Sequence, residues 1–273
     1  MAIVTLTSDF GSKDYLAGAF KGRLLQRLAD CRLMDISHEV EPFNFAEAAY
    51  IIQNSVFNYP EHSYHLLLVN LFDTTQSLPL LAYHKGHYFG VADNGLLPMV
   101  LGSQPEQVIK LNISASQQYN TLAWADAFAD AIFKIEDGIS FHLIGEEPES
   151  VVEKFSLQAN YGEDFIHGRI IFIDRFENVV VNITRQDFER IGKGRPFTIS
   201  FNSRDHIRRI NDGYPQVVEG SSLAFFNSAG YLEIAVNKGN AAGLFGLQAF
   251  SHLANPEFMK SRMFYQTVRI LFG

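Results

Sequence analysis

Residues 2–11 read AIVTLTSDFG, and this stretch decides the first part of the fold. The apolar run that ends at Leu6 predicts a short β-strand, and Asp9 comes shortly after it, behind Thr7 and Ser8. Open α/β sheets bind ligands at the carboxyl ends of their strands. A carboxylate there, with a second at Asp14, suits two adjacent hydroxyls such as a ribose diol. The stretch lacks the glycines and lysine of a phosphate-binding loop. The alternative is that Asp9 caps the following helix.

The first half of the chain continues with alternating strands and helices. Strands are predicted at residues 2–6, 32–36, 65–70 and 88–91, and helices at residues 15–29, 45–56 and 125–135. This alternation is typical of a largely parallel sheet that helices cover on both faces.

The pattern changes after the acidic, proline-containing residues 146–149. Short β-like runs separated by Gly, Asn and Asp then predict an antiparallel sheet or small barrel; they occupy residues 169–173, 179–183, 197–201, 222–227 and 232–236. The sequence therefore predicts an α/β domain over residues 1–155, a β-barrel-like domain over residues 165–255 and a C-terminal tail over residues 256–273. Within the tail, the aromatic-rich residues 258–272 are interpreted as a packing or subunit-contact helix. Basic residues interrupt them, which argues against a membrane anchor.

Composition narrows the class of protein. The 273 residues are 47% hydrophobic and 19% charged, which is ordinary for a globular protein. A formal net charge of -8 argues against nucleic acid as a partner, because phosphate binding needs clustered basic residues. The single cysteine excludes an intrachain disulfide, and the histidines between residues 62 and 87 lack the spacing of a metal site. No stretch has the length and hydropathy of a membrane span or secretion signal, so a cytoplasmic location is expected.

Two polar clusters lie in the second half. Residues 174–178 read DRFEN, in which an Asn can read the edge of a base, an aromatic ring can stack on it and an Asp can hold an ammonium group. Residues 227–230 read NSAG and residues 237–242 read NKGNAA, a Gly/Asn loop whose backbone can approach a ligand closely. The alternative for each cluster is a turn between strands, with an Asx cap in the first.

These motifs, with ISH at residues 36–38 and ADNGLL at residues 92–97, resemble in order those of the S-adenosylmethionine hydroxide adenosyltransferase family. That family is related to the adenosyl fluorinases and chlorinases. The resemblance implies an N-terminal α/β domain and a C-terminal β-barrel-like domain. It also implies a homotrimer with binding sites between neighbouring subunits.

The resemblance assigns roles to individual residues. It implies that Asp9 holds the ribose hydroxyls and that Asn178 contacts the edge of the adenine, with Phe176 and Tyr214 flanking the ring. The remaining implied site residues are Asp174 and Ser228 for the amino acid group of methionine, Asp14 in the same pocket, Phe43 where halogenases carry a tryptophan beside the reacting centre, and the backbone near Ala241 for further adenine contacts.

The implied reaction is a displacement at the ribose 5′ carbon, in which S-adenosylmethionine (SAM) and water give adenosine and methionine. SAM is then a substrate or ligand, and no cofactor is implied. In the hydrolases an Asp, an Arg and a His handle the water. The matching positions here are Asn70, Ser77 and Ala123, so this triad is absent. The halide loop of the halogenases is absent too.

Two functions therefore stay open. Asp73 supplies a substitute carboxylate if the altered loop folds differently, with Thr74 or Thr75 as hydroxyl donors. The protein is then an enzyme that cleaves SAM slowly or uses another nucleophile. The other function is a non-catalytic protein that senses SAM or adenosine. Trp124, the only tryptophan, either fills the space of the missing histidine or stacks on a ligand.

Overall fold

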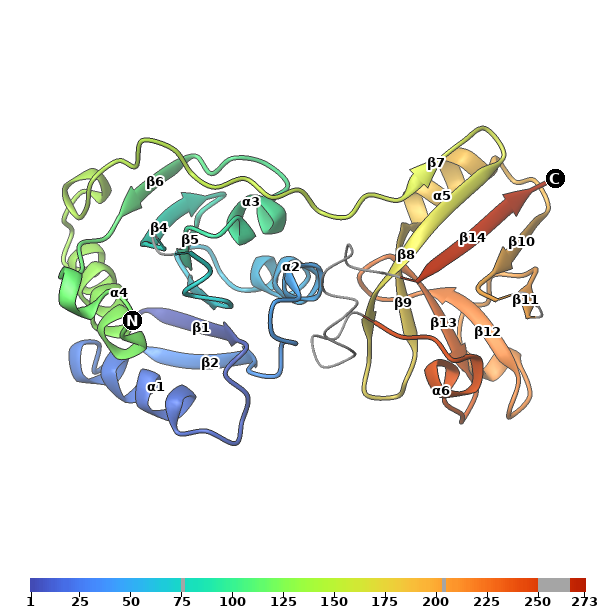
Figure 1. The fold of residues 1–273 in the computed structure, drawn as a ribbon, viewed down its shortest axis with the longest axis horizontal. Coiled ribbons are helices and arrows are strands. Elements are labelled where there is room, and N and C mark those ends of the chain that lie inside the picture. Colours follow the sequence, from blue (N-terminus) through green and yellow to red (C-terminus); the bar gives the residue numbers. More distant parts are fainter. Residues whose placement is uncertain (75–76, 203–204, 250–265) are drawn as a thin grey trace. The chain divides into compact units, whose positions relative to one another are not determined.

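The computed structural model describes residues 1–74, 77–202, 205–249 and 266–273. The chain divides into two compact units, Met1–Ser156 (unit 1) and Leu157–Gly273 (unit 2), which Figure 1 shows as a blue-to-green and a yellow-to-red part.

Unit 1 is built on a six-stranded sheet of order β2-β1-β3-β5-β4-β6. The strands are β1 (Ile3–Ser8), β2 (Arg32–Ser37), β3 (Tyr64–Leu68), β4 (Pro79–His84), β5 (His87–Ala92) and β6 (Gln107–Lys110). Pairing is parallel from β2 through β1 and β3 to β5, whereas β4 is antiparallel to both of its neighbours. The predicted largely parallel sheet is confirmed, and β4 and β6 are additions that the sequence reading did not contain.

Helices cover both faces of this sheet. They are α1 (Leu16–Arg27), α2 (Phe45–Gln53), α3 (Leu96–Leu101) and α4 (Thr121–Glu136), with short 3-10 helices at Val56–Asn58, Ala115–Gln117 and Phe141–Leu143. Because successive strand residues point to opposite faces, Leu66 and Leu68 join the core beneath α1 and α4, while Leu67 joins the core beneath α2 and α3. Asn120 begins α4 by accepting the N–H groups of Leu122 and Ala123.

Unit 2 is an antiparallel, nearly closed barrel-like sheet, as predicted. Its strand order is β11-β10-β14-β8-β9-β13-β12, and β7 pairs with β8. The strands are β7 (Asn160–Tyr161), β8 (Phe165–Ile173), β9 (Val179–Thr184), β10 (Phe197–Ser200), β11 (His206–Ile207), β12 (Ser222–Phe226), β13 (Tyr231–Val236) and β14 (Thr267–Phe272). Its helices are α5 (Arg185–Gly192), α6 (Ala241–Phe245) and the 3-10 helix Tyr214–Gln216.

The predicted helix at residues 258–272 is wrong where the structure describes it. Thr267–Phe272 is strand β14, which lies between β8 and β10 (Figure 1). The physical reason is strict alternation, since Val268, Ile270 and Phe272 are buried and the residues between them are exposed. Residues 258–265 lie outside the described part of the chain.

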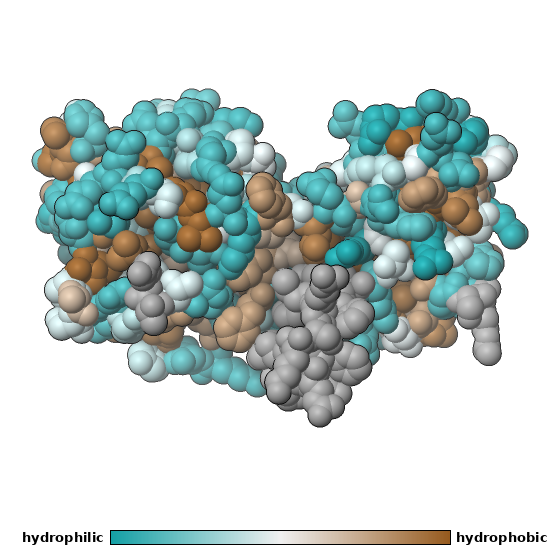
Figure 2. Space-filling model, turned by 45° about the horizontal axis from the view of Figure 1, so that its top comes forward, coloured by the Kyte–Doolittle hydropathy of each residue, from teal (hydrophilic) through white to brown (hydrophobic). Residues whose placement is uncertain are grey.

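Hydrophilic residues cover most of the face of each unit that Figure 2 shows, and hydrophobic residues form smaller areas among them. Among the described residues, no helix combines the length and the apolar character needed to cross a membrane.

Candidate functional site

The carboxyl ends of neighbouring strands place Asp9 beside the end of β3 in unit 1. The Asp9 carboxylate (Oδ2) accepts the backbone N–H of Asn70 at 2.8 Å. Burial raises the pKa of Asp9, and the Asn70 N–H opposes that shift because it stabilises the charged form. The alternative role as a helix cap is wrong: α1 begins at Leu16, and its N-cap residue is Tyr15, with no side-chain capping bond.

Two further predicted residues of unit 1 lie on exposed loops. Asp14 lies in the loop that leads into α1. Phe43 is 48% exposed and has a left-handed backbone conformation, with φ of 64°. This conformation costs a non-glycine residue on the order of 1 kcal/mol. Their placement in a ligand pocket stays a prediction.

Asn70 connects Asp9 to the predicted substitute carboxylate, Asp73. The side-chain amide of Asn70 donates to Asp73 Oδ1 at 2.7 Å. The other oxygen of Asp73, Oδ2, accepts from Lys154 Nζ at 3.0 Å. The structure therefore brings Asp9, Asn70 and Asp73 together, and it adds Lys154. The sequence reading missed Lys154, because it lies 81 residues from Asp73 and no local pattern joins the two.

Ser77 and Ala123, the other two positions that the family resemblance matched to the hydrolase triad, take part in local backbone structure. Ser77 is fully buried, and its hydroxyl accepts the N–H of Thr74 at 3.0 Å, which closes a turn. Ala123 lies in the first turn of α4, where its N–H bonds to the Asn120 side chain. Thr75, one of the predicted hydroxyl donors, lies outside the described residues.

Trp124 is a core residue. Its side chain is fully buried, and its indole Nε1 donates to the carbonyl of Gln118 at 2.8 Å. Its ring packs edge-on against Phe72 and Phe128. This burial supports the space-filling alternative and leaves no exposed face on which a ligand can stack.

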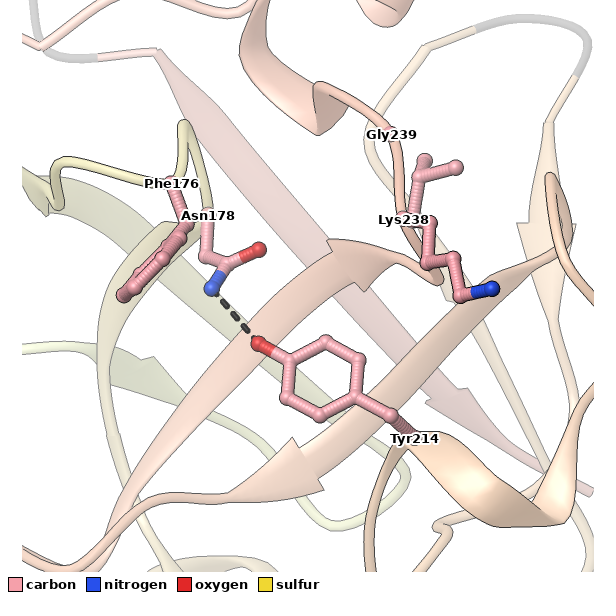
Figure 3. Close-up of a pocket in the computed structure, with 6 residues that line it drawn as sticks. Phe176, Asn178, Tyr214, Lys238 and Gly239 are labelled. Atoms are coloured by element: carbon pink, nitrogen blue, oxygen red, sulfur yellow. Dashed lines mark hydrogen bonds between the residues drawn. The ribbon is translucent and has the colours of Figure 1, made fainter.

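Unit 2 contains a cavity of about 260 Å³. It is lined by Phe176, Asn178, Tyr214, Val236, Lys238 and Gly239 (Figure 3). Its volume is below the roughly 300–1,000 Å³ of sites for drug-sized ligands, so it suits a ring system rather than a whole nucleotide. The structure thus brings together Phe176, Asn178 and Tyr214, which the sequence analysis assigned to one site. Lys238 and Gly239 were not assigned, although they belong to the Gly/Asn loop that the sequence analysis noted.

Hydrogen bonds fix the amide of Asn178 at this cavity. Its Nδ2 donates to the Tyr214 hydroxyl at 2.7 Å, the dashed line in Figure 3, and to Asp174 Oδ2 at 3.1 Å. Asp174 Oδ1 accepts the N–H groups of Phe176 and Asn178, at 2.8 and 2.9 Å. The Asx-capped turn that the sequence allowed is therefore present. It also places Phe176 and Asn178 at the cavity.

The other two residues predicted in unit 2 lie on either side of β13, Ser228 in the turn before it and Ala241 at the start of α6 after it. Ser228 is exposed in the turn between β12 and β13. Ala241 is buried at the start of α6, and the next N–H, of Ala242, donates to the carbonyl of Glu177 at 3.0 Å. The start of α6 is thereby joined to the turn that carries Phe176 and Asn178.

Comparison with known proteins gives consistent matches over most of the chain. Residues 4–145 match the family model of the SAM hydroxide adenosyltransferase N-terminal domain, and residues 168–253 match that of the C-terminal domain. A relative from Methanocaldococcus jannaschii, named (R)-S-adenosyl-L-methionine hydrolase, is 27% identical over 89% of this chain and 91% of its own. A protein of the same name from Thermus thermophilus is 28% identical over 91% and 97% of the two chains.

A solved structure shares the fold. The crystal structure of an uncharacterized conserved protein from Thermotoga maritima has a TM-score of 0.78 at 21% identity, covering 98% of this chain and 99% of its own.

Proposed function

The chain belongs to the SAM hydroxide adenosyltransferase family, and we propose that it binds SAM or adenosine and carries out the family reaction, in which SAM and water give adenosine and methionine. The observation that carries this proposal is the cavity of unit 2, where Phe176, Asn178 and Tyr214 meet. In this proposal the two rings flank an adenine and Asn178 contacts its edge.

The proposed reaction requires the protein mainly to position the water and the substrate. The sulfonium group of SAM is a good leaving group that departs as neutral methionine. Catalysis then consists mainly of aligning the water with the 5′ carbon and removing other solvent. We propose that Asp9 holds the ribose hydroxyls, that Asp174 and Ser228 hold the amino acid group, and that Asp14, Phe43 and the backbone near Ala241 complete the site.

A non-catalytic sensor of SAM or adenosine is the second candidate. It is favoured by Ser77 and Ala123, which occupy two positions of the hydrolase triad and take part in a turn and a helix start instead. In a variant of the first candidate, the enzyme, a nucleophile other than water displaces methionine from SAM.

The assembly and the location are proposals as well. From the family resemblance we propose a homotrimer with sites between neighbouring subunits, a small nucleoside as the partner, and no cofactor, metal or nucleic acid. The cytoplasm is the proposed location.

Incubation with SAM separates the two candidates. Adenosine is followed by chromatography, and SAM and adenosine binding are measured by calorimetry. Adenosine release above a no-protein control supports the enzyme. Measurable binding with no release supports the sensor. If neither ligand binds at millimolar concentration, the proposed function is wrong.

We expect Asp9→Ala to weaken adenosine binding by ~1–3 kcal/mol, because a half-buried carboxylate that is proposed to accept hydroxyl hydrogen bonds is lost. Calorimetric titration of the variant and the wild type measures this difference. Asp126→Ala, which removes an exposed carboxylate of α4, is the control and should bind like the wild type. Equal affinity of Asp9→Ala and the wild type would contradict the role of Asp9.

A further inference from the structure

One residue, Asn70, holds two carboxylates at the end of β3. Its backbone N–H bonds to Asp9 and its side-chain amide to Asp73, at 2.8 and 2.7 Å. Its own carbonyl accepts from the side chain of Asn94 at 3.0 Å. Asn70 adopts the left-handed conformation, with φ of 47°, which Asn tolerates better than most residues. The positions of Asp9 and Asp73 are therefore fixed relative to each other through a single residue.

Contacts with Phe45 and Gly95 hold the Lys154 side chain in place beside Asp73. Its ammonium lies 3.9 Å from the centroid of the Phe45 ring, a cation–π contact, and 3.0 Å from Asp73 Oδ2. Its stem fills the space beside Gly95, where a Cβ atom would overlap with it. These contacts fix the direction from which the ammonium approaches the carboxylate.

The chain on either side of Lys154 is also tied down. The N–H of Val152 donates to Asp93 Oδ1 at 2.8 Å, and the hydroxyl of Ser156 donates to the carbonyl of Met99 at 3.2 Å. Lys154 is thus part of a fixed segment rather than a free surface lysine.

This arrangement leaves Asp73 able to accept from a further donor. Each carboxylate oxygen has about two lone pairs, and the described bonds use one on each oxygen. The side chain of Asp73 is 30% exposed, so water can reach it. Asp73 is a second negative charge near Asp9, and the ammonium of Lys154 offsets it.

We propose that Asp73 accepts a proton from the water that attacks the 5′ carbon of a bound nucleoside, and that Asn70 and Lys154 are positioning residues for its carboxylate. This inference rests on the proposed function, in which Asp9 holds the ribose. The water oxygen forms a bond to the 5′ carbon and the carbon–sulfur bond breaks. Its electron pair stays on the methionine sulfur, and the water proton passes to Asp73 and then to solvent.

The test compares steady-state hydrolysis of SAM and calorimetric binding for the wild type, Asp73→Asn, Lys154→Met and Lys154→Arg. Lys110→Met is the matched control, since Lys110 is similarly exposed and forms its own ion pair with Glu146, at 3.2 Å. Thermal melts establish that each variant is folded.

We expect Asp73→Asn to lower kcat by about 100-fold or more, the range of general-base catalysis. Lys154→Met should lower kcat by about 10-fold with affinity for SAM within about twofold, because positioning residues act on the reacting geometry. Lys154→Arg should recover most of the loss, and Lys110→Met should match the wild type.

The inference is overturned if Asp73→Asn keeps the wild-type kcat, or if Lys154→Met changes only KM. It is also overturned if the wild type binds SAM and releases no adenosine, in which case the binding part of the proposed function stands. Absence of binding would instead remove the proposed function and this inference with it.

Discussion

Ser77→Arg is expected to lower the free energy of unfolding by about 3 kcal/mol or more without raising hydrolysis. Arginine is the residue that the family resemblance implies for the hydrolases at this position. Here the Ser77 side chain is fully buried, and its hydroxyl bonds to the N–H of Thr74. A guanidinium at this buried place loses its hydration, and the described hydrogen-bond partners of the Ser77 hydroxyl are the neutral groups of Thr74. Urea denaturation of the variant and the wild type measures the difference.

Ser77→Ala is the matched control for this change. It removes only the hydroxyl's two hydrogen bonds to Thr74, of which the one to Oγ1 is long at 3.4 Å, and should cost about 1 kcal/mol. The triple variant Asn70→Asp, Ser77→Arg and Ala123→His should likewise gain no activity. A stable triple variant that releases adenosine faster than the wild type would show that the loop accepts the hydrolase triad after all.

The second large effect concerns pH. His65 is fully buried in unit 1, with hydrogen bonds from its ring nitrogens to Thr5 Oγ1 at 2.8 Å and to His87 Nδ1 at 3.1 Å. Burial, followed by the charge of His87, lowers the pKa of His65 to about 3. The unfolded chain therefore binds a proton at higher pH than the folded chain. The contribution of neutral His65 to the free energy of unfolding is therefore fully present above about pH 6.5. It is lost as the pH falls towards 3, and the loss is on the order of 5 kcal/mol.

Urea midpoints at pH 7, 5 and 4 measure this loss. Carboxylates also contribute to acid unfolding, so the informative quantity is the difference between variants. His65→Gln should show a smaller fall in stability over this range, whereas His142→Gln, which changes an exposed histidine, should follow the wild type. An identical pH dependence for His65→Gln and the wild type would show that the imidazole does not control acid stability.

The pattern of apolar and polar residues within short segments predicts most of the strands of this fold. The apolar run before Asp9 and the β-like runs of unit 2 appear as strands, because burial and alternation are properties of short segments. Strand β14 shows the same signal in its alternating Val268, Ile270 and Phe272. The expectation of a helix there takes these residues together with the aromatic residues before them, whereas the segment itself alternates with a period of two.

The candidate site was predictable only in part for a different reason. Asn178 and Phe176 lie within five residues and share one turn, so their proximity follows from the sequence. The bond between Asp73 and Lys154 joins residues 81 positions apart, and it depends on how the segment after α4 returns to the sheet. Lys154 follows an acidic stretch of the sequence, and nothing in that local pattern predicts that it contacts Asp73.

The position of β14 has a consequence for synthesis of the protein. Residues 267–272 pair with both β8 and β10, whereas the other strands found among the described residues of unit 2 are encoded upstream of residue 237. During translation, β8 and β10 leave the ribosome with their β14-facing edges open, and they stay so until residue 272 has emerged. Unit 1 has no such dependence, because its sheet is made from residues 3–110. A nascent chain stalled near residue 260 would therefore contain the complete sheet of unit 1 and an incomplete sheet in unit 2. The unpaired strand edges of unit 2 make this form prone to aggregation unless a chaperone binds it.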